Sequence, residues 1–202
     1  MKCMIVIKSN DLSKGNHILL SKDEIVEVDL NTLSYDSLST EPLTEHFNEY
    51  YKTEKKDTVR YEAEPELIIV GKIFNNYHEE FQSDIESRYM TEQLKNYITN
   101  KFGNNFNLKD KERLLVENIL LLNRENVKEF SKWEYKRNYD EGKDYRDIVL
   151  EFISTEGDSI IVYLDKMYIY DYFEEQDIEK GYGEYKIILR KNPIIKENVE
   201  VN

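Results

Sequence analysis

The chain has 202 residues, of which 40% are hydrophobic and 34% charged, and its formal net charge at pH 7 is −13. This surplus of acids argues against unassisted binding to nucleic acids and to anionic membranes, because both need Lys and Arg to replace counterions. Sixteen Tyr and eight Phe exclude a disordered chain, since disordered segments are poor in aromatic residues. The length fits a single domain over residues 1–202, with a small N-terminal β subdomain over residues 1–58 as the alternative.

The single cysteine, Cys3, allows no disulfide within the chain and is typical of a reducing compartment. The longest apolar runs, residues 3–7 and 160–164, are too short for a signal peptide or a transmembrane helix. The excess of Asn, Lys, Ile and Tyr indicates a gene of low GC content. We therefore expect a cytoplasmic protein of a bacterium or of an infected bacterial host, without membrane contact.

The N-terminal part of the chain predicts a β-meander. Its short segments are apolar or alternate between apolar and charged residues, and turn-forming Ser, Asn, Asp and Gly residues separate them. A short helix follows over residues 43–52, with Pro42 near its first turn, where proline is tolerated. The three expected strands are residues 2–8, 16–20 and 24–30.

Two further strands are predicted over residues 59–64 and 66–74. Pro65 separates them in this interpretation, because proline cannot donate a hydrogen bond to a ladder. Gly71 lies inside the second strand and predicts either a bulge or a close approach of another group to the backbone.

Two amphipathic helices are predicted in the middle of the chain, over residues 79–101 and 108–122. Apolar residues recur there every three or four positions, which is the period of a helix face. Gly103 follows the first helix at the position that favours a left-handed cap, and Asn107 precedes the second as an N-cap.

The remainder predicts antiparallel sheet. Residues 127–137 could extend the helical region, but Trp133 and Tyr135 alternate there with charged residues, so a strand is favoured. Gly157 marks the turn of a hairpin between residues 145–154 and 159–170, and residues 183–191 supply a returning strand. Together these elements predict an α+β fold, in which antiparallel sheet from the N- and C-terminal strands packs against two central amphipathic helices.

Acidic residues concentrate near the C-terminal end. Residues 141–202 carry 8 basic and 15 acidic side chains, whereas residues 101–140 have a net charge of +2. Tyrosines alternate there with carboxylates; tyrosines are enriched at protein interfaces, and carboxylates would attract a basic partner. The alternative interpretation is an ordinary half-exposed strand followed by a solvated turn. The predicted partner-binding residues are Tyr168, Tyr170, Asp171, Tyr172, Glu174, Glu175, Asp177 and Glu179.

A catalytic alternative combines Asp165 with Glu184 and Lys186 on the next strand. This pattern resembles the metal-binding core of restriction-endonuclease-like nucleases. The resemblance implies that the two carboxylates hold a divalent cation and that the lysine stabilises charge near the scissile phosphate. It covers only these three positions, and the net charge of −13 disfavours a DNA-cutting surface.

Other chemistries lack a signature in this sequence. His17, His46 and His78 are scattered without the spacing of metal ligands. The chain also has no dinucleotide fingerprint, no P-loop and no nucleophile motif. We therefore predict no cofactor and no metal site.

These observations favour a non-enzymatic binding protein whose partner is a basic, nucleic-acid-handling protein. A phage-encoded inhibitor of bacterial defence, of the anti-CRISPR type, or an immunity protein against a nuclease toxin has this profile. The alternatives are a metal-dependent nuclease and a self-associating structural protein, and the oligomeric state stays open.

Overall fold

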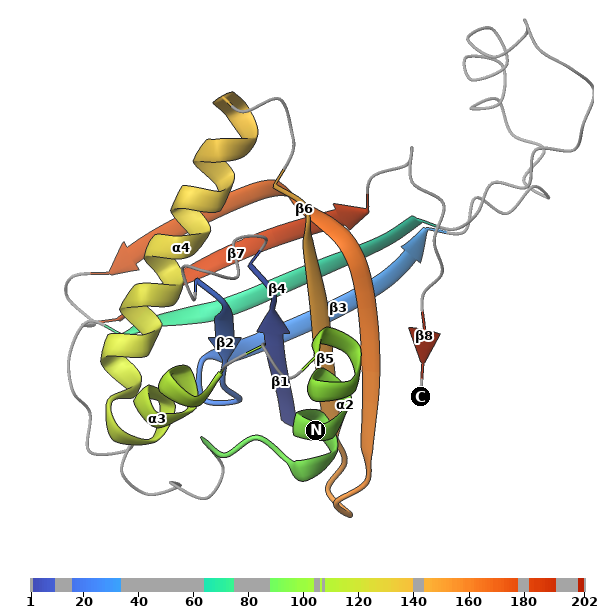
Figure 1. Ribbon diagram of the computed structural model, residues 1–202. Helices are drawn as coiled ribbons and strands as arrows, with labels where there is room; N and C mark the ends of the chain where they lie inside the picture. Colours follow the sequence, from blue (N-terminus) through green and yellow to red (C-terminus); the bar gives the residue numbers. More distant parts are fainter. Residues whose placement is uncertain are drawn as a thin grey trace, which may run out of the picture.

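The computed structural model describes residues 2–9, 16–33, 64–74, 88–103, 106, 108–139, 144–177, 182–191 and 200–201. It confirms the predicted α+β fold, with antiparallel strands from both ends of the chain around central helices (Figure 1). The strands are β1 (Lys2–Ile7), β2 (Ile18–Leu20), β3 (Ile25–Leu33), β4 (Glu64–Phe74), β5 (Arg146–Ile153), β6 (Ser159–Asp177), β7 (Tyr182–Lys191) and β8 (Glu200–Val201). The helices are α2 (Glu92–Phe102), α3 (Lys109–Glu117) and α4 (Ile119–Tyr139).

The described strands form one sheet in the order β2-β1-β5-β6-β7-β4-β3, with β8 paired to β6. The long strand β6 joins the two halves of this sheet: its first part, up to Met167, pairs with β5, and its second part, from Met167 onwards, pairs with β7. Between the two parts, Lys166 has a φ of 52°, in the left-handed region that non-glycine residues seldom adopt. Figure 1 shows β6 arching from one end of the sheet to the other.

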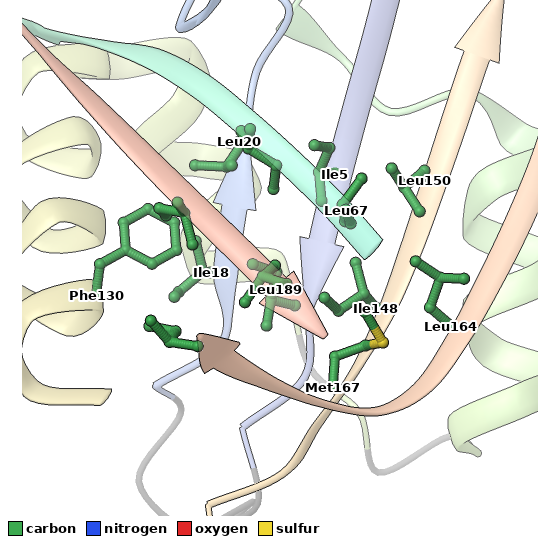
Figure 2. Packing of buried hydrophobic residues seen from close by; sticks show 14 of the residues in the cluster. Ile5, Ile18, Leu20, Leu67, Phe130, Ile148, Leu150, Leu164, Met167 and Leu189 are labelled. Atoms are coloured by element: carbon green, nitrogen blue, oxygen red, sulfur yellow. The ribbon is translucent and has the colours of Figure 1, made fainter. Parts of the chain in front are cut away.

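We call β2, β1, β5 and the first part of β6 the first half-sheet, and the rest of β6 with β7, β4 and β3 the second half-sheet. The bend in β6 turns one face of each towards the other. Figure 2 shows side chains of both half-sheets meeting in this space, with Phe130 of α4 at one side. The buried residues of this core include Ile5, Ile18, Leu67, Phe130, Trp133, Ile148, Leu164, Ile187 and Leu189.

A second core lies on the other face of the first half-sheet. Strand side chains alternate between the two cores: Ile5 and Ile7 belong to the first core, whereas Met4 and Val6 belong to the second. Helices α2 and α3 and the first turn of α4 cover this second core. Its buried helix residues are Leu94, Ile98, Leu115, Ile119 and Leu122.

Helix α2 begins later than the predicted 79–101 helix. Residues 79–87 lie outside the described part of the chain, and residues 88–91 are not α-helical. Thr91 is the N-cap, because its Oγ1 accepts a hydrogen bond from the Leu94 amide at 3.1 Å. Gly103 ends the helix at the predicted position with a φ of 81°, but its ψ of 169° lies outside the left-handed helical region that the sequence predicted.

The predicted 108–122 helix is two helices, separated at Asn118. This residue has an extended φ of −151°, which interrupts α3. Its side-chain Oδ1 accepts a hydrogen bond from the Leu121 amide at 3.0 Å and so caps the start of α4. The predicted cap at Asn107 lies outside the described residues.

The prediction of a strand over residues 127–137 is wrong, because this segment is part of α4. The alternation around Trp133 covers only a few residues and coincides with a longer helical pattern. Asn126, Phe130 and Trp133 are buried at spacings of four and three residues, which is one face of a helix. Phe130 and Trp133 fill the first core from this face.

Pro65 does not interrupt β4, contrary to the sequence-based expectation. It pairs with Thr32 of β3 and lies one residue outside the pairing with β7, which begins at Glu66. Its missing N–H therefore costs no hydrogen bond to β7. The expected segments over residues 43–52 and 59–63 lie outside the described part of the chain, and the division into domains stays a prediction.

The close approach predicted at Gly71 is confirmed. A Cβ atom added to Gly71 would lie 2.2 Å from Cζ of Tyr185, whose ring crosses the glycine from the adjacent strand β7. Opposite Gly71 on its other side, β3 has a register shift between Ile25 and Glu27. The missing side chain thus makes room for a fully buried tyrosine ring.

We expect Gly71→Ala to lower the free energy of unfolding by about 1–3 kcal/mol, because the new methyl group overlaps a packed ring. Urea unfolding of both proteins measures this change. In a Tyr185→Leu background the same substitution should cost less, since the ring is gone. Additive effects of the two substitutions would contradict the proposed overlap.

Candidate functional site

The second half-sheet has one face in the first core and one face directed away from it. Burial alternates along β7: Tyr185 and Ile187 are buried, whereas Glu184 and Lys186 are exposed. We call the exposed side of β7, its register partners on β6, β4 and β3, and the two residues at the register shifts, Val26 and Tyr170, the outer face. It consists of Val26, Glu27, Asp29, Asn31, Glu66, Ile68, Val70, Lys72, Tyr168, Tyr170, Asp171, Phe173, Glu175, Glu184, Lys186, Ile188 and Arg190.

Helix α4 contacts this half-sheet from the opposite side. The ring of Phe130 lies 5.4 Å from that of Tyr185 and 6.2 Å from that of Tyr172. Ser131 donates a hydrogen bond to Glu174 at 2.9 Å. Within the described residues, the outer face therefore has no helix against it, and large apolar side chains are open to solvent there.

The outer face has an apolar centre. Ile68 of β4 and Ile188 of β7 are directly opposite each other, and both are half-buried. Three more exposed side chains extend this centre towards β3 and β6: Val26 is 50% exposed, Tyr170 42% and Phe173 56%. Exposed aromatic side chains around an apolar centre are typical of protein-binding surfaces.

Acidic side chains line both margins of this centre. Glu27 and Asp29 lie on β3, and Asp171 and Glu175 lie on β6 at the other margin. Between the margins, Arg190 is already paired: its Nε lies 2.6 Å from Glu66, and its guanidinium stacks on Tyr170 at 3.6 Å from the ring centroid. Acids outnumber bases among the outer-face residues, so the face carries net negative charge.

Two acids of this face are directly opposite each other: Glu175 of β6 and Glu184 of β7. Like charges in this position destabilise a sheet. Lys72 lies opposite Glu184 on its other side, and Lys186 lies two residues from Glu184 on the same face, so two cations of this chain lie near the acidic pair.

The structure divides the predicted partner-binding residues between the two faces of β6. Tyr168, Tyr170, Asp171 and Glu175 belong to the outer face, whereas Tyr172 and Glu174 face α4. The register shift at Tyr170 places Tyr170 and Asp171 on the same side. The strand continues to Asp177, beyond its predicted end at residue 170, and Glu179 lies outside the described residues.

Tyr172 and Glu174 have a structural role instead. The Tyr172 hydroxyl and Ser131 both donate to the same oxygen of Glu174, which ties β6 to α4. Burial raises the pKa of Tyr172 well above its ordinary value, and the adjacent Glu174 carboxylate raises it further. Tyr172 is therefore a neutral hydrogen-bond donor at physiological pH.

The structure does not bring Asp165, Glu184 and Lys186 together. Asp165 forms a buried ion pair with Lys191, with Nζ 2.6 Å from Oδ1, at the bend of β6. Glu184 lies at the opposite end of β7, separated from Lys191 by about 23 Å of strand at roughly 3.3 Å per residue. No group of His, Cys, Asp and Glu among the described residues could hold a metal ion.

The structure contains a buried polar cluster around Glu24 that was not predicted from the sequence. Glu24 accepts hydrogen bonds from Asn123 at 2.7 Å, from Asn126 at 3.4 Å and from the Ser21 amide at 3.0 Å. Asn126 also donates to the Leu19 carbonyl of β2, at 2.9 Å. These bonds join α4 to the turn between β2 and β3.

Asn123 extends the same cluster to β4. It donates to the Lys72 carbonyl and accepts from the Phe74 amide, both at 2.8 Å. The two asparagines lie three residues apart, on the helix face that Phe130 continues, and this shared spacing is the signal by which they could have been found.

A second buried cluster joins α4 to β5. Arg146 pairs with Glu129 at 3.0 Å and with Asp144 at 3.3 Å, and its guanidinium lies 4.4 Å from the ring centroid of Trp133. Trp133 donates to the Asp144 carbonyl at 2.7 Å. Two carboxylates and an aromatic face compensate the buried charge, as a structural site requires, although Nη1 of Arg146 has no hydrogen-bond partner.

A hollow of about 460 Å³ lies where α2 meets α3. Met90, Ile98 and Leu108 form its apolar wall, and the ion pair between Lys95 and Glu112, at 3.0 Å, lies at its polar side. The hydroxyl of Thr99, which also lines the hollow, donates a hydrogen bond to the Lys95 carbonyl of its own helix at 2.9 Å.

Comparisons with known proteins add little to this picture. No family model matches the chain, and no curated protein matches it in sequence. Among solved structures, it is similar to a chain of the anti-feeding prophage (AFP) baseplate, determined by cryo-EM with 6-fold symmetrisation. The TM-score is 0.43 and the identity 8%, over 100% of this chain and 92% of that chain. A similarity this weak supports no statement about function.

The described helices also bear on membrane contact. None of them combines the length and the apolar content that a membrane crossing requires, the 21-residue α4 included.

The Glu24 cluster predicts a pH dependence of stability. Burial raises the Glu24 pKa from 4.5 to about 7, so the folded protein holds this proton more tightly than the unfolded chain does. The resulting stabilisation is complete below pH 4.5 and is lost as the pH rises through 7. We expect the stability of the natural protein relative to Glu24→Gln to fall by about 3 kcal/mol over this window, at about 1.4 kcal/mol per pKa unit.

Urea unfolding of both proteins at several pH values measures this difference. His17 changes stability with the opposite sign, because burial first, and nearby cations second, lower its pKa to about 4. It is present in both proteins and therefore cancels in the comparison. A difference that does not change with pH would contradict the role given to Glu24.

Proposed function

We propose that this chain is a non-enzymatic binding protein that docks on the basic surface of a partner protein through its outer face. The observation that carries the proposal is the arrangement of this face: an exposed apolar centre with Tyr170 and Phe173, between two acidic margins. Apolar and aromatic area supplies affinity at an interface, and charges at its rim select the partner and accelerate the encounter.

The partner surface is expected to complement both the apolar centre and the acidic margins of the outer face. It needs an apolar or aromatic group to cover Ile68, Ile188 and Phe173, with Lys or Arg residues on either side. Proteins that bind nucleic acids carry such basic surfaces to contact phosphates. We therefore propose a nucleic-acid-handling protein as the partner, which this chain inhibits by occupying its basic surface. An inhibitor of bacterial defence and a nuclease-immunity protein both fit this description.

The acidic margins disfavour self-association through the same face. Two copies packed outer face to outer face would bring acids of one copy towards acids of the other, at a cost in free energy. A basic partner removes this repulsion, so the charge pattern favours a heterologous complex.

Reversing two outer-face charges should abolish the binding. The variant Asp171→Lys/Glu175→Lys leaves the bonds of Glu174 to Ser131 and Tyr172 in place. It removes one hydrogen bond within β6, which the Asp171 carboxylate accepts from the Tyr172 amide at 2.9 Å. We expect natural protein immobilised on resin to capture a basic nucleic-acid-binding protein from a low-GC bacterial lysate, and to lose it at high salt. The reversed variant should capture at least about tenfold less.

The matched control is Glu156→Lys/Asp158→Lys. It makes the same change in net charge at the exposed turn between β5 and β6, away from the outer face. The control should capture the partner as the natural protein does. Thermal unfolding shows whether both variants are folded; Glu175→Lys should be tolerated, because it converts the repulsion with Glu184 into an attraction. Equal capture by the reversed variant and the control would refute the proposal.

A further inference from the structure

The second half-sheet ends at β3, which pairs with β4 on one side. Within the described residues, no strand pairs with the other side of β3. Alternate N–H and C=O groups of such a strand point away from its own sheet and are available to a further strand. After the register shift at Ile25, the pairing with β4 is regular to Leu33. The backbone groups on the open side of β3 are therefore regularly spaced, as a further strand needs.

The two rows of side chains along β3 differ in character. Val28 and Leu30 are half-buried and pack against the first core, together with Ile25. Glu27 and Asp29 alternate with them on the outer face and are exposed. A strand added to this edge would complete the burial of the first row and lie beside the second.

We infer that β3 binds an extended segment of the partner by strand addition, with Lys or Arg at alternate positions of that segment and apolar residues between them. The inference rests on the proposed function in taking the partner to be basic. Main-chain hydrogen bonds to the edge would supply affinity, and alternate side chains would supply specificity. Glu27 and Asp29 lie about 7 Å apart along the strand, which matches basic residues at positions i and i+2 of the segment.

The same two acids argue against a second copy as the occupant. Antiparallel pairing of two β3 strands centred on Val28 places Glu27 of each copy opposite Asp29 of the other. Like charges directly opposite each other destabilise the pair, and charged residues are a usual protection of edge strands against self-pairing. A basic segment converts both repulsions into attractions.

The test uses the full chain and a capped peptide of roughly eight residues in which Lys and Val alternate. Amide hydrogen exchange of the labelled protein, read by NMR, locates the binding. We expect the peptide to slow exchange of β3 amides by roughly fivefold or more at saturation. A peptide with Glu in place of Lys should have no effect, nor should one with Pro in place of Val, because proline cannot donate to the edge.

The charge-swapped variant Glu27→Lys/Asp29→Lys sharpens the test. Its affinity for the Lys–Val peptide should fall by at least about tenfold, and it should now bind the Glu–Val peptide. Glu156→Lys/Asp158→Lys, with the same change in net charge, should behave like the natural protein. Peptide binding that leaves β3 exchange unchanged, no binding at all, or equal binding of the proline peptide would each overturn the inference.

These outcomes are separable from those of the capture experiment. If Asp171→Lys/Glu175→Lys abolishes capture while the peptide does not slow exchange at β3, docking through the outer face is supported and strand addition at β3 is refuted. If the peptide slows exchange at β3 but Asp171→Lys/Glu175→Lys still captures the partner, strand addition at β3 is supported and docking through the outer face is refuted.

Discussion

The bend in β6 is the constraint on which the fold depends, because one strand serves as a member of both half-sheets. Asp165 and Lys191 form their buried ion pair at this bend, and the Lys166 amide donates to Asp147 at 3.2 Å in the adjoining strand. A buried pair of charges gains little net stability but is costly to break, so it fixes one geometry of the bend. With β6 bent, the two apolar faces meet and enclose the first core.

Helix α4 then completes the enclosure, and its polar residues are as important as its apolar ones. Phe130 and Trp133 fill the core, while Asn123 and Asn126 satisfy backbone groups of β2 and β4 that the helix would otherwise cover without a hydrogen bond. Every described helix packs either against the first core or against the first half-sheet. The outer face is the side of the second half-sheet against which no described helix packs.

Local patterns in the sequence located several strands, because apolar alternation and turn residues lie close together along the chain. They did not predict that β4 continues through Pro65 or that β6 extends to Asp177. The hairpin around Gly157 and the close approach at Gly71 are examples. The segment 127–137 was misassigned because the alternation at Trp133 outweighed the helical spacing from Asn126. The charged and tyrosine-rich stretch was recognised, but the sequence could not assign its faces. The register shift at Tyr170 decides these faces, and it depends on the pairing with β7.

The pairing of β1 with β5 has a consequence for how the protein is made. Ile5 lies opposite Leu150, so the first half-sheet joins segments far apart along the chain. At a synthesis rate of about 5–20 residues per second, the apolar strand β1 waits roughly 7–30 seconds for this neighbour. Until then only the short pairing with β2 is available to it. Non-local contacts of this kind slow folding, and they make the nascent N-terminal strand a natural client for chaperones.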